Sequence, residues 1–164
     1  MKELFLDLKD YLSEKTVFER KAARGIIIKN NKLLCIHSKY GDYKFPGGGV
    51  EKNETIEKAL CREVLEETGY SVKEDSLQLA FLVHEKRKGK DSDIMLMDSY
   101  YFFCEVYENR VEQSLVDYEI EYQYKVDWLS VNEIISRNES CKNVNSIPWI
   151  KRETLVMKEL LKLQ

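Results

Sequence analysis

Apolar residues recur at a helical interval in four segments of the chain. The spacing predicts a short amphipathic helix over about 3–13, a helix over 55–68, a helix that starts near residue 131, and a final helix over about 147–163. Gly69 follows the second of these segments, where glycine commonly ends a helix. The pattern therefore predicts helices at both ends of the chain and between them.

Alternating or continuous apolar runs predict strands in the remaining segments. Residues 22–38 indicate two strands joined at Asn30-Asn31, a turn pair that tolerates positive φ. Residues 40–54 are rich in turn formers and predict a loop with a brief strand. Further strands are expected at 77–87, 98–107 and 120–130, the first two being joined by the polar loop 88–93. Strands interspersed with helices favour an α/β fold rather than a helical bundle or a barrel.

Composition limits the class of protein. The chain has 164 residues, of which 43% are hydrophobic and 34% charged, and its formal net charge is −3. These values predict one globular domain over 1–164 and do not indicate a nucleic-acid partner. Its longest apolar runs are too short to span a membrane, and acidic residues interrupt the leucines near the N-terminus, unlike a secretory signal. We predict a cytoplasmic protein.

The cysteines are not arranged as a metal or redox motif. No C-x-x-C pair occurs and no histidine lies nearby at ligand spacing, so a zinc site is not favoured. We expect reduced thiols that lie mostly in the core: Cys35, Cys61, Cys104 and Cys141.

The helix over 55–68 carries acidic residues where its apolar stripe should continue. Glu63, Glu66 and Glu67 follow Ala59 and Leu60 on the same side at i, i+3 and i+4 spacing. Like charges at these spacings cost roughly 0.2–0.5 kcal/mol each, and the helix dipole disfavours anions in the last turn. A bound divalent cation would offset these costs, because such ions take carboxylate oxygens as ligands. The alternative is a solvated, glutamate-rich helix end.

The loop before this helix adds to the case for a site. Three consecutive glycines, Gly47–Gly49, allow the backbone to pass close to a ligand. Glu54 and Arg62 carry opposite charges and are spaced so that they can tie this loop to the helix. A passive surface pair is the alternative.

Residues 48–70 resemble the Nudix box, G-x5-E-x7-R-E-U-x-E-E-x-G-U, where U is a bulky aliphatic residue. All its polar positions match, and the one departure is Tyr70 at the last aliphatic position, where we expect only packing to differ. The pattern is filled by Gly48, Glu54, Arg62, Glu63, Val64, Glu66, Glu67 and Gly69.

This resemblance implies a Nudix fold, an α/β/α sandwich around a mixed β-sheet. It also implies hydrolysis of a nucleoside diphosphate linked to a group X, with Mg²⁺ or Mn²⁺ as cofactor and a small-molecule nucleotide as substrate. Glu54 and Arg62 would support the loop and helix, and Glu54 would also reach metal-bound water. The implied metal ligands are Glu63, Glu66, Glu67 and the backbone carbonyl of Gly47.

In the Nudix family, a glutamate on a later loop can serve as an extra ligand or as the base. Here Glu119 or Glu121 would take that role, the alternative being an exposed acidic loop. Arg20, Lys21 and Arg24 are candidates for phosphate contacts, or else solvated charges. The aromatic run 100–103 must divide between two sheet faces, which places two of its rings at a pocket or in the core.

The substrate is approached by elimination. ADP-ribose hydrolases of the family tend to have a proline about sixteen residues after the box, whereas the prolines here are Pro46 and Pro148. The corresponding signatures of dinucleoside polyphosphate, coenzyme A and NADH hydrolases are also missing. The remaining class resembles MutT and cleaves a (deoxy)nucleoside triphosphate to a monophosphate and pyrophosphate.

Two other functional classes share the fold. A nucleotide-sensing Nudix module often loses box glutamates, and an isopentenyl-diphosphate isomerase does not keep the intact box, whereas this chain keeps every glutamate. The sequence does not decide between a monomer and a homodimer.

Overall fold

The computed structural model describes residues 1–163. Four helices are formed: α1 (Ile56–Thr68), α2 (Asp117–Glu121), α3 (Val131–Glu139) and α4 (Trp149–Leu161), with a 3-10 turn at Glu74–Ser76. The strands are β1 (Lys2–Asp7), β2 (Val17–Ile26), β3 (Ile28–Lys29), β4 (Lys32–His37), β5 (Tyr43–Lys44), β6 (Gly47–Gly49), β7 (Tyr70–Val72), β8 (Gln78–Lys88), β9 (Ile94–Phe103), β10 (Val106–Arg110) and β11 (Lys125–Leu129).

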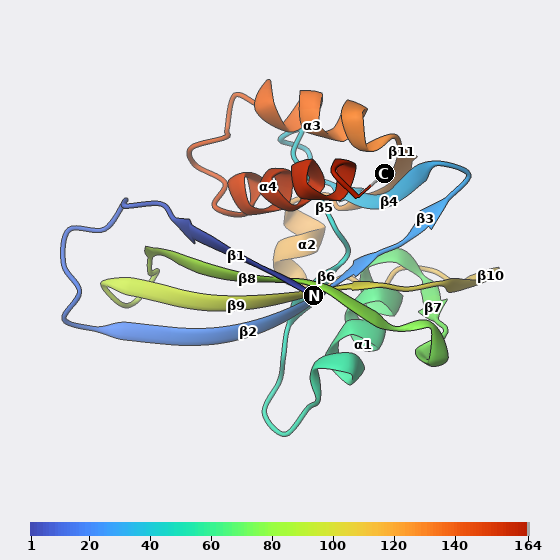
Figure 1. Ribbon diagram of the computed structural model, residues 1–164, viewed down its shortest axis with the longest axis horizontal. Coiled ribbons are helices and arrows are strands. Elements are labelled where there is room, and N and C mark those ends of the chain that lie inside the picture. The colour runs from blue at the N-terminus through green and yellow to red at the C-terminus, as the bar shows by residue number, and fades with distance from the viewer. Residues whose placement is uncertain (164) are drawn as a thin grey trace.

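The strands lie between two layers of helices (Figure 1). One sheet has the order β1-β8-β9-β2-β6, in which β1 pairs with β8 and β2 with β9 in parallel, while the other neighbours are antiparallel. A second sheet contains β11, β4 and β3, and β5 pairs with β4. Helices α3 and α4 cover one side and α1 the other. The predicted α/β/α sandwich around a mixed sheet is confirmed.

Two apolar cores lie on opposite sides of the sheets. Strand β9 shows the alternation, because Tyr101 belongs to the core beneath α3 and α4, whereas Phe102 belongs to the core beneath α1. The aromatic run 100–103 thus packs in the two cores. The four cysteines are free thiols, and all but the half-buried Cys61 are buried, as predicted. No helix within residues 1–163 is long and apolar enough to cross a membrane.

Local signals set the ends of α1 and the first hairpin. The Thr55 hydroxyl accepts a hydrogen bond from the Lys58 amide at 3.2 Å, which caps the start of α1. Gly69 ends the helix in the left-handed region at φ 76°. Asn30 and Asn31 also have positive φ, at 50° and 62°, between β3 and β4. These predicted boundaries are confirmed.

The predicted N-terminal helix over 3–13 is wrong. Residues Lys2–Asp7 form strand β1, which pairs in parallel with β8 and places Leu4 opposite Val83. Leu4 and Leu6 alternate inward onto the core, which is the spacing of a strand. An isolated helix of this length is only marginally stable, whereas the edge of the sheet provides backbone hydrogen-bond partners along the whole segment. Contacts with the rest of the fold therefore decide its conformation.

The strand predicted over 120–130 is shorter than expected. Asp117–Glu121 forms α2, Gln123 has a positive φ of 57°, and pairing with β4 begins only at Lys125. The boundary matters for function, because a helix and a strand point Glu119 and Glu121 in different relative directions.

Candidate active site

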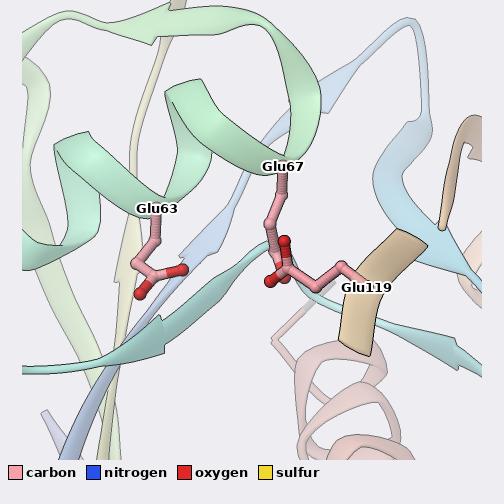
Figure 2. A group of neighbouring side chains, drawn as sticks. All are labelled: Glu63, Glu67 and Glu119. Atoms are coloured by element: carbon pink, nitrogen blue, oxygen red, sulfur yellow. The ribbon is translucent and has the colours of Figure 1, made fainter. Parts of the chain in front are cut away.

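Three carboxylates converge between α1 and α2. Glu63 and Glu67 project from the same side of α1, and the Glu67 carboxylate meets that of Glu119 from α2, as Figure 2 shows. One oxygen from each lies within 4.8 Å of the others. We call these three residues the carboxylate cluster. Glu63 and Glu67 meet because residues four apart lie on the same face of a helix, whereas Glu119 reaches them through the tertiary fold.

Glu67 is the most deeply buried member of the cluster. Its side chain is 1% exposed, and Lys44 Nζ lies 2.6 Å from its Oε1. Its other oxygen accepts a hydrogen bond from the Gly47 amide at 2.8 Å. Burial raises the pKa of Glu67, although the Lys44 charge opposes the shift. The carboxylate is therefore held in position by Lys44 and the Gly47 amide.

Glu63 lies against the glycine strand β6. A Cβ at Gly48 would approach the Glu63 carboxylate to 2.5 Å, so a side chain there would displace this carboxylate from its present position. Burial raises the pKa of Glu63, the hydrogen bond from Arg62 opposes this shift, and the negative charge of Glu67 adds to it. The glycine thus allows a half-buried carboxylate to face the same space as Glu67.

The structure separates the two later glutamates. Glu119 is 3% exposed. Its carboxylate accepts hydrogen bonds from the Val116 amide and the Tyr118 hydroxyl, both at 3.0 Å. Glu121 is exposed and lies outside the cluster. Of the two candidates, Glu119 alone is brought to Glu63 and Glu67.

Arg62 joins the glycine loop to α1. Its guanidinium donates to both oxygens of Glu54 at 2.9 Å and to the Gly49 carbonyl at 3.0 Å. The predicted link between Glu54 and Arg62 is present, and the Arg62 hydrogen bond lowers the pKa of Glu54. Arg62 also contacts Glu63 at 2.8 Å and Glu66 at 3.3 Å. Glu66 is thus held beside the cluster rather than within it, and its role as a ligand stays a prediction.

Gly47 has a conformation that suits glycine, with φ at 142°, and a Cβ there would clash with the Ala23 backbone carbonyl. Its carbonyl accepts a hydrogen bond from Arg24 Nη1 at 3.3 Å. Its amide binds Glu67, so this residue connects the cluster to β2. The carbonyl's role as a further ligand stays a prediction.

The donor set fits a hard divalent cation. Lys44 contacts Glu67, and Arg62 contacts Glu63 but also Glu54 and Glu66, so these two cations face five carboxylates and leave a formal charge of −3 (−5 + 2) when all seven groups are ionised. Mg²⁺ and Mn²⁺ prefer carboxylate oxygens and would offset most of that charge. The residues that would hold such an ion are Glu63, Glu67 and Glu119.

Lys44 was not predicted from the sequence. It lies three residues before Gly47, in a brief strand whose sequence does not indicate burial. Yet its side chain is 7% exposed and lies over the Tyr124 ring at 4.4 Å. Of the basic candidates on β2, Arg24 is buried, whereas Arg20 and Lys21 are exposed. Tyr70, the departure from the box, packs edge-on against Trp128, so its difference is one of packing.

The fold and the site together define a class, an α/β/α sandwich with a buried carboxylate cluster beside a glycine strand. The model of the NUDIX domain family matches residues 19–151. The chain belongs to the NUDIX domain family.

Known relatives align with part of the chain. An ADP-ribose pyrophosphatase from Methanocaldococcus jannaschii is 48% identical over 60 residues, which cover 34% of this chain and 36% of that protein. An 8-oxo-dGTP diphosphatase from Buchnera aphidicola subsp. Acyrthosiphon pisum is 32% identical over 83 residues, covering 42% and 67%. The chain therefore aligns with about a third of the length of the first relative and two thirds of the second.

A solved structure shows the same fold. The MutT NUDIX hydrolase from Burkholderia pseudomallei superimposes with a TM-score of 0.56 at 19% sequence identity, covering 70% of this chain and 85% of that one. At this identity the likeness concerns the fold alone.

Proposed function

We propose that the protein is a metal-dependent pyrophosphohydrolase that cleaves a nucleoside diphosphate linked to a group X. The observation that carries the proposal is the carboxylate cluster of Glu63, Glu67 and Glu119, buried beside β6 in a chain of the NUDIX domain family. Buried carboxylates without full pairing are costly, and such costs are characteristic of functional sites.

In this proposal the cluster holds Mg²⁺ or Mn²⁺, with Glu66 and the Gly47 carbonyl as further ligands. When bound, the metal ions neutralise the diphosphate and lower the pKa of the attacking water. Phosphoryl transfer then depends mainly on positioning and charge stabilisation. Arg62 and Glu54 supply the positioning, because their hydrogen bonds fix α1 relative to the glycine strand.

Glu119 is our candidate for the base. Its carboxylate is held by the Val116 amide and the Tyr118 hydroxyl, which fix its direction and leave it acceptor capacity for a proton from water. Burial raises the pKa of Tyr118, which keeps that hydroxyl a donor at neutral pH. Glu121 has no comparable support in the structure and is exposed.

For the substrate, we favour a (deoxy)nucleoside triphosphate that is cleaved to a monophosphate and pyrophosphate. One relative named above is an 8-oxo-dGTP diphosphatase, which agrees with this class, whereas another is an ADP-ribose pyrophosphatase. Both names describe substrates in which a nucleoside carries at least two phosphates.

A phosphate-release screen tests the proposal. The protein is incubated with Mg²⁺ or Mn²⁺ and with ordinary and oxidised dNTPs, NTPs, ADP-ribose, NADH, dinucleoside polyphosphates and nucleotide sugars, and products are converted to phosphate by coupling enzymes. We expect metal-dependent turnover of one class. If no substrate in the panel is hydrolysed but some of them raise the melting temperature, the nucleotide-sensing module is favoured instead.

A further inference from the structure

A pocket rich in arginine adjoins the carboxylate cluster. It has a volume of about 180 Å³, and no acidic side chain is among the residues that line it. We call it the arginine pocket. Its lining includes Arg20, Arg24, Lys44, Gly48, Arg87 and Arg152.

Strand register brings three of these arginines to one face of the sheet. Arg20 lies opposite Met97, and Arg24 follows four residues later on the same side of β2. Arg87 lies opposite Met95, two residues before Met97 on β9 and therefore on the same face. The convergence is thus built into the fold rather than made by flexible surface side chains.

The pocket has more positive charge than its partners neutralise. Its five cations are contacted by three carboxylates, which leaves a formal charge of +2 (5 − 3). The contacts pair Glu67 with Lys44, Glu153 with Arg24 and Arg152, and Glu85 with Arg87 and Arg152.

Arg24 and Arg20 retain unused donors. The Arg24 side chain is 8% exposed, and its Nε, 3.4 Å from Glu153, makes no hydrogen bond among the described residues. Arg20 forms no ion pair or side-chain hydrogen bond with residues 1–163, and its guanidinium lies against Gly49. An unpartnered donor on a buried arginine is costly, and an anion would satisfy it.

The pocket borders the cluster, because two of its lining residues adjoin cluster glutamates. Lys44 lines the pocket and binds Glu67, and Gly48 lines the pocket and contacts Glu63. A phosphate chain that starts at the cluster would enter the pocket directly. The pocket shares Arg87 and Pro148 with a second hollow of about 420 Å³, whose charged lining residues also include Lys88, Lys90, Lys151 and Asp10.

We propose that the arginine pocket binds phosphate groups of the substrate beyond the phosphate attacked at the cluster. This proposal rests on the proposed function. It adds that the group X linked to the nucleoside diphosphate carries negative charge. The preferred class is then a nucleotide with a chain of three or more phosphates, and ADP-ribose, whose X is an uncharged sugar, is a poorer substrate. Arg20 sets this preference because its charge is otherwise unpaired.

Binding of inorganic tripolyphosphate, measured by calorimetry in EDTA at fixed ionic strength, tests the pocket without metal or turnover. Arg20→Gln is expected to weaken binding roughly ten- to hundredfold, as loss of a charge-assisted hydrogen bond does. The matched control is Lys21→Gln: although the sequence also makes Lys21 a candidate for phosphate contacts, it follows Arg20 on β2 and so points to the opposite face of the sheet, is exposed, is not among the pocket residues, and should bind like the wild type. No binding to the wild type, or equal loss in both variants, would overturn the proposal.

Kinetics separate the pocket from the reaction. With Mg²⁺, Arg20→Gln should lower kcat/KM for ATP at least about tenfold while changing that for ADP-ribose less than about threefold. Equal losses of kcat/KM for the two substrates would refute the proposed role of the pocket but not the hydrolase function. If tripolyphosphate binding depends on Arg20 but the protein hydrolyses no substrate in the panel, the assignment of the pocket as a phosphate site holds and the proposed hydrolase function is refuted.

Discussion

Replacing Glu67 with glutamine is expected to reduce metal-dependent hydrolysis by about 10²–10³-fold, the range that loss of one charge-stabilising group costs at other active sites. Glutamine keeps the shape and can still accept the Gly47 amide hydrogen bond. It removes the charge that lies between Lys44 and the other carboxylates. The variant should therefore keep the fold, at a cost in stability because the buried Lys44 loses its ion pair, and should lose turnover. The measurement is kcat/KM for the substrate found in the screen, with thermal unfolding as the check on folding.

The control for this variant is Glu57→Gln. Glu57 lies in the first turn of the same helix, is exposed, and is outside the cluster. Its replacement should leave kcat/KM within about twofold of the wild type, as for surface changes away from a site. Wild-type turnover in Glu67→Gln, or equal losses in the two variants, would show that the cluster is not the reaction centre.

Glu153→Ala should lower the free energy of unfolding by about 3–5 kcal/mol, because it leaves buried cations without their partner. Glu153 is fully buried on α4. It accepts hydrogen bonds from the Tyr101 hydroxyl and the Phe45 amide at 2.9 Å and from Arg152 Nη2 at 2.8 Å. It also lies 3.4 Å from Arg24 Nε. Urea unfolding followed by circular dichroism measures the loss.

An exposed ion pair provides the contrast. Glu105 contacts Lys73 at 2.9 Å but is 71% exposed, so Glu105→Ala should cost less than about 1 kcal/mol. A Glu153→Ala variant that loses no more than this control would contradict the structural role of the buried network.

The contribution of Glu153 should also depend on pH. Burial acts to raise the pKa of its carboxyl, but Arg24 and Arg152 outweigh burial, and the folded-state pKa lies below the ordinary 4.5. The stabilisation from the ionised form is therefore present above that value and is lost as the pH falls through the folded pKa. The stability difference between wild type and Glu153→Gln should shrink below about pH 4.5. A difference that grows in acid would reverse this assignment.

Features encoded by neighbouring residues were predicted well. Thr55 and Gly69 delimit α1 through hydrogen bonds that each makes within its own helix, and both are recognisable in the sequence. The spacing of Glu63 and Glu67 was enough to place two carboxylates on one face. The pair of Glu54 and Arg62 was also anticipated, because eight residues span the loop and two turns of helix.

Features that depend on distant segments were not predicted. Strand β1 forms because it pairs with β8 at the edge of the sheet, and the sequence of Lys2–Asp7 does not indicate this pairing. The choice between Glu119 and Glu121 required the short helix α2, in which residues two apart point about 200° away from each other, whereas a strand would have placed them on one face. Lys44 became part of the site only through its contact with Glu67 from α1.

Titration of Mn²⁺, followed by electron paramagnetic resonance, into wild type, Glu119→Gln and Glu121→Gln tests most directly whether the carboxylate cluster is a metal site. We expect Glu119→Gln to weaken Mn²⁺ affinity at least about tenfold, since changes to groups around a metal commonly cost ten- to hundredfold. Glu121→Gln, altered two residues away on the exposed side of α2, should bind Mn²⁺ as the wild type does. Unchanged affinity in Glu119→Gln, or the same loss in both variants, would contradict the assignment of the site.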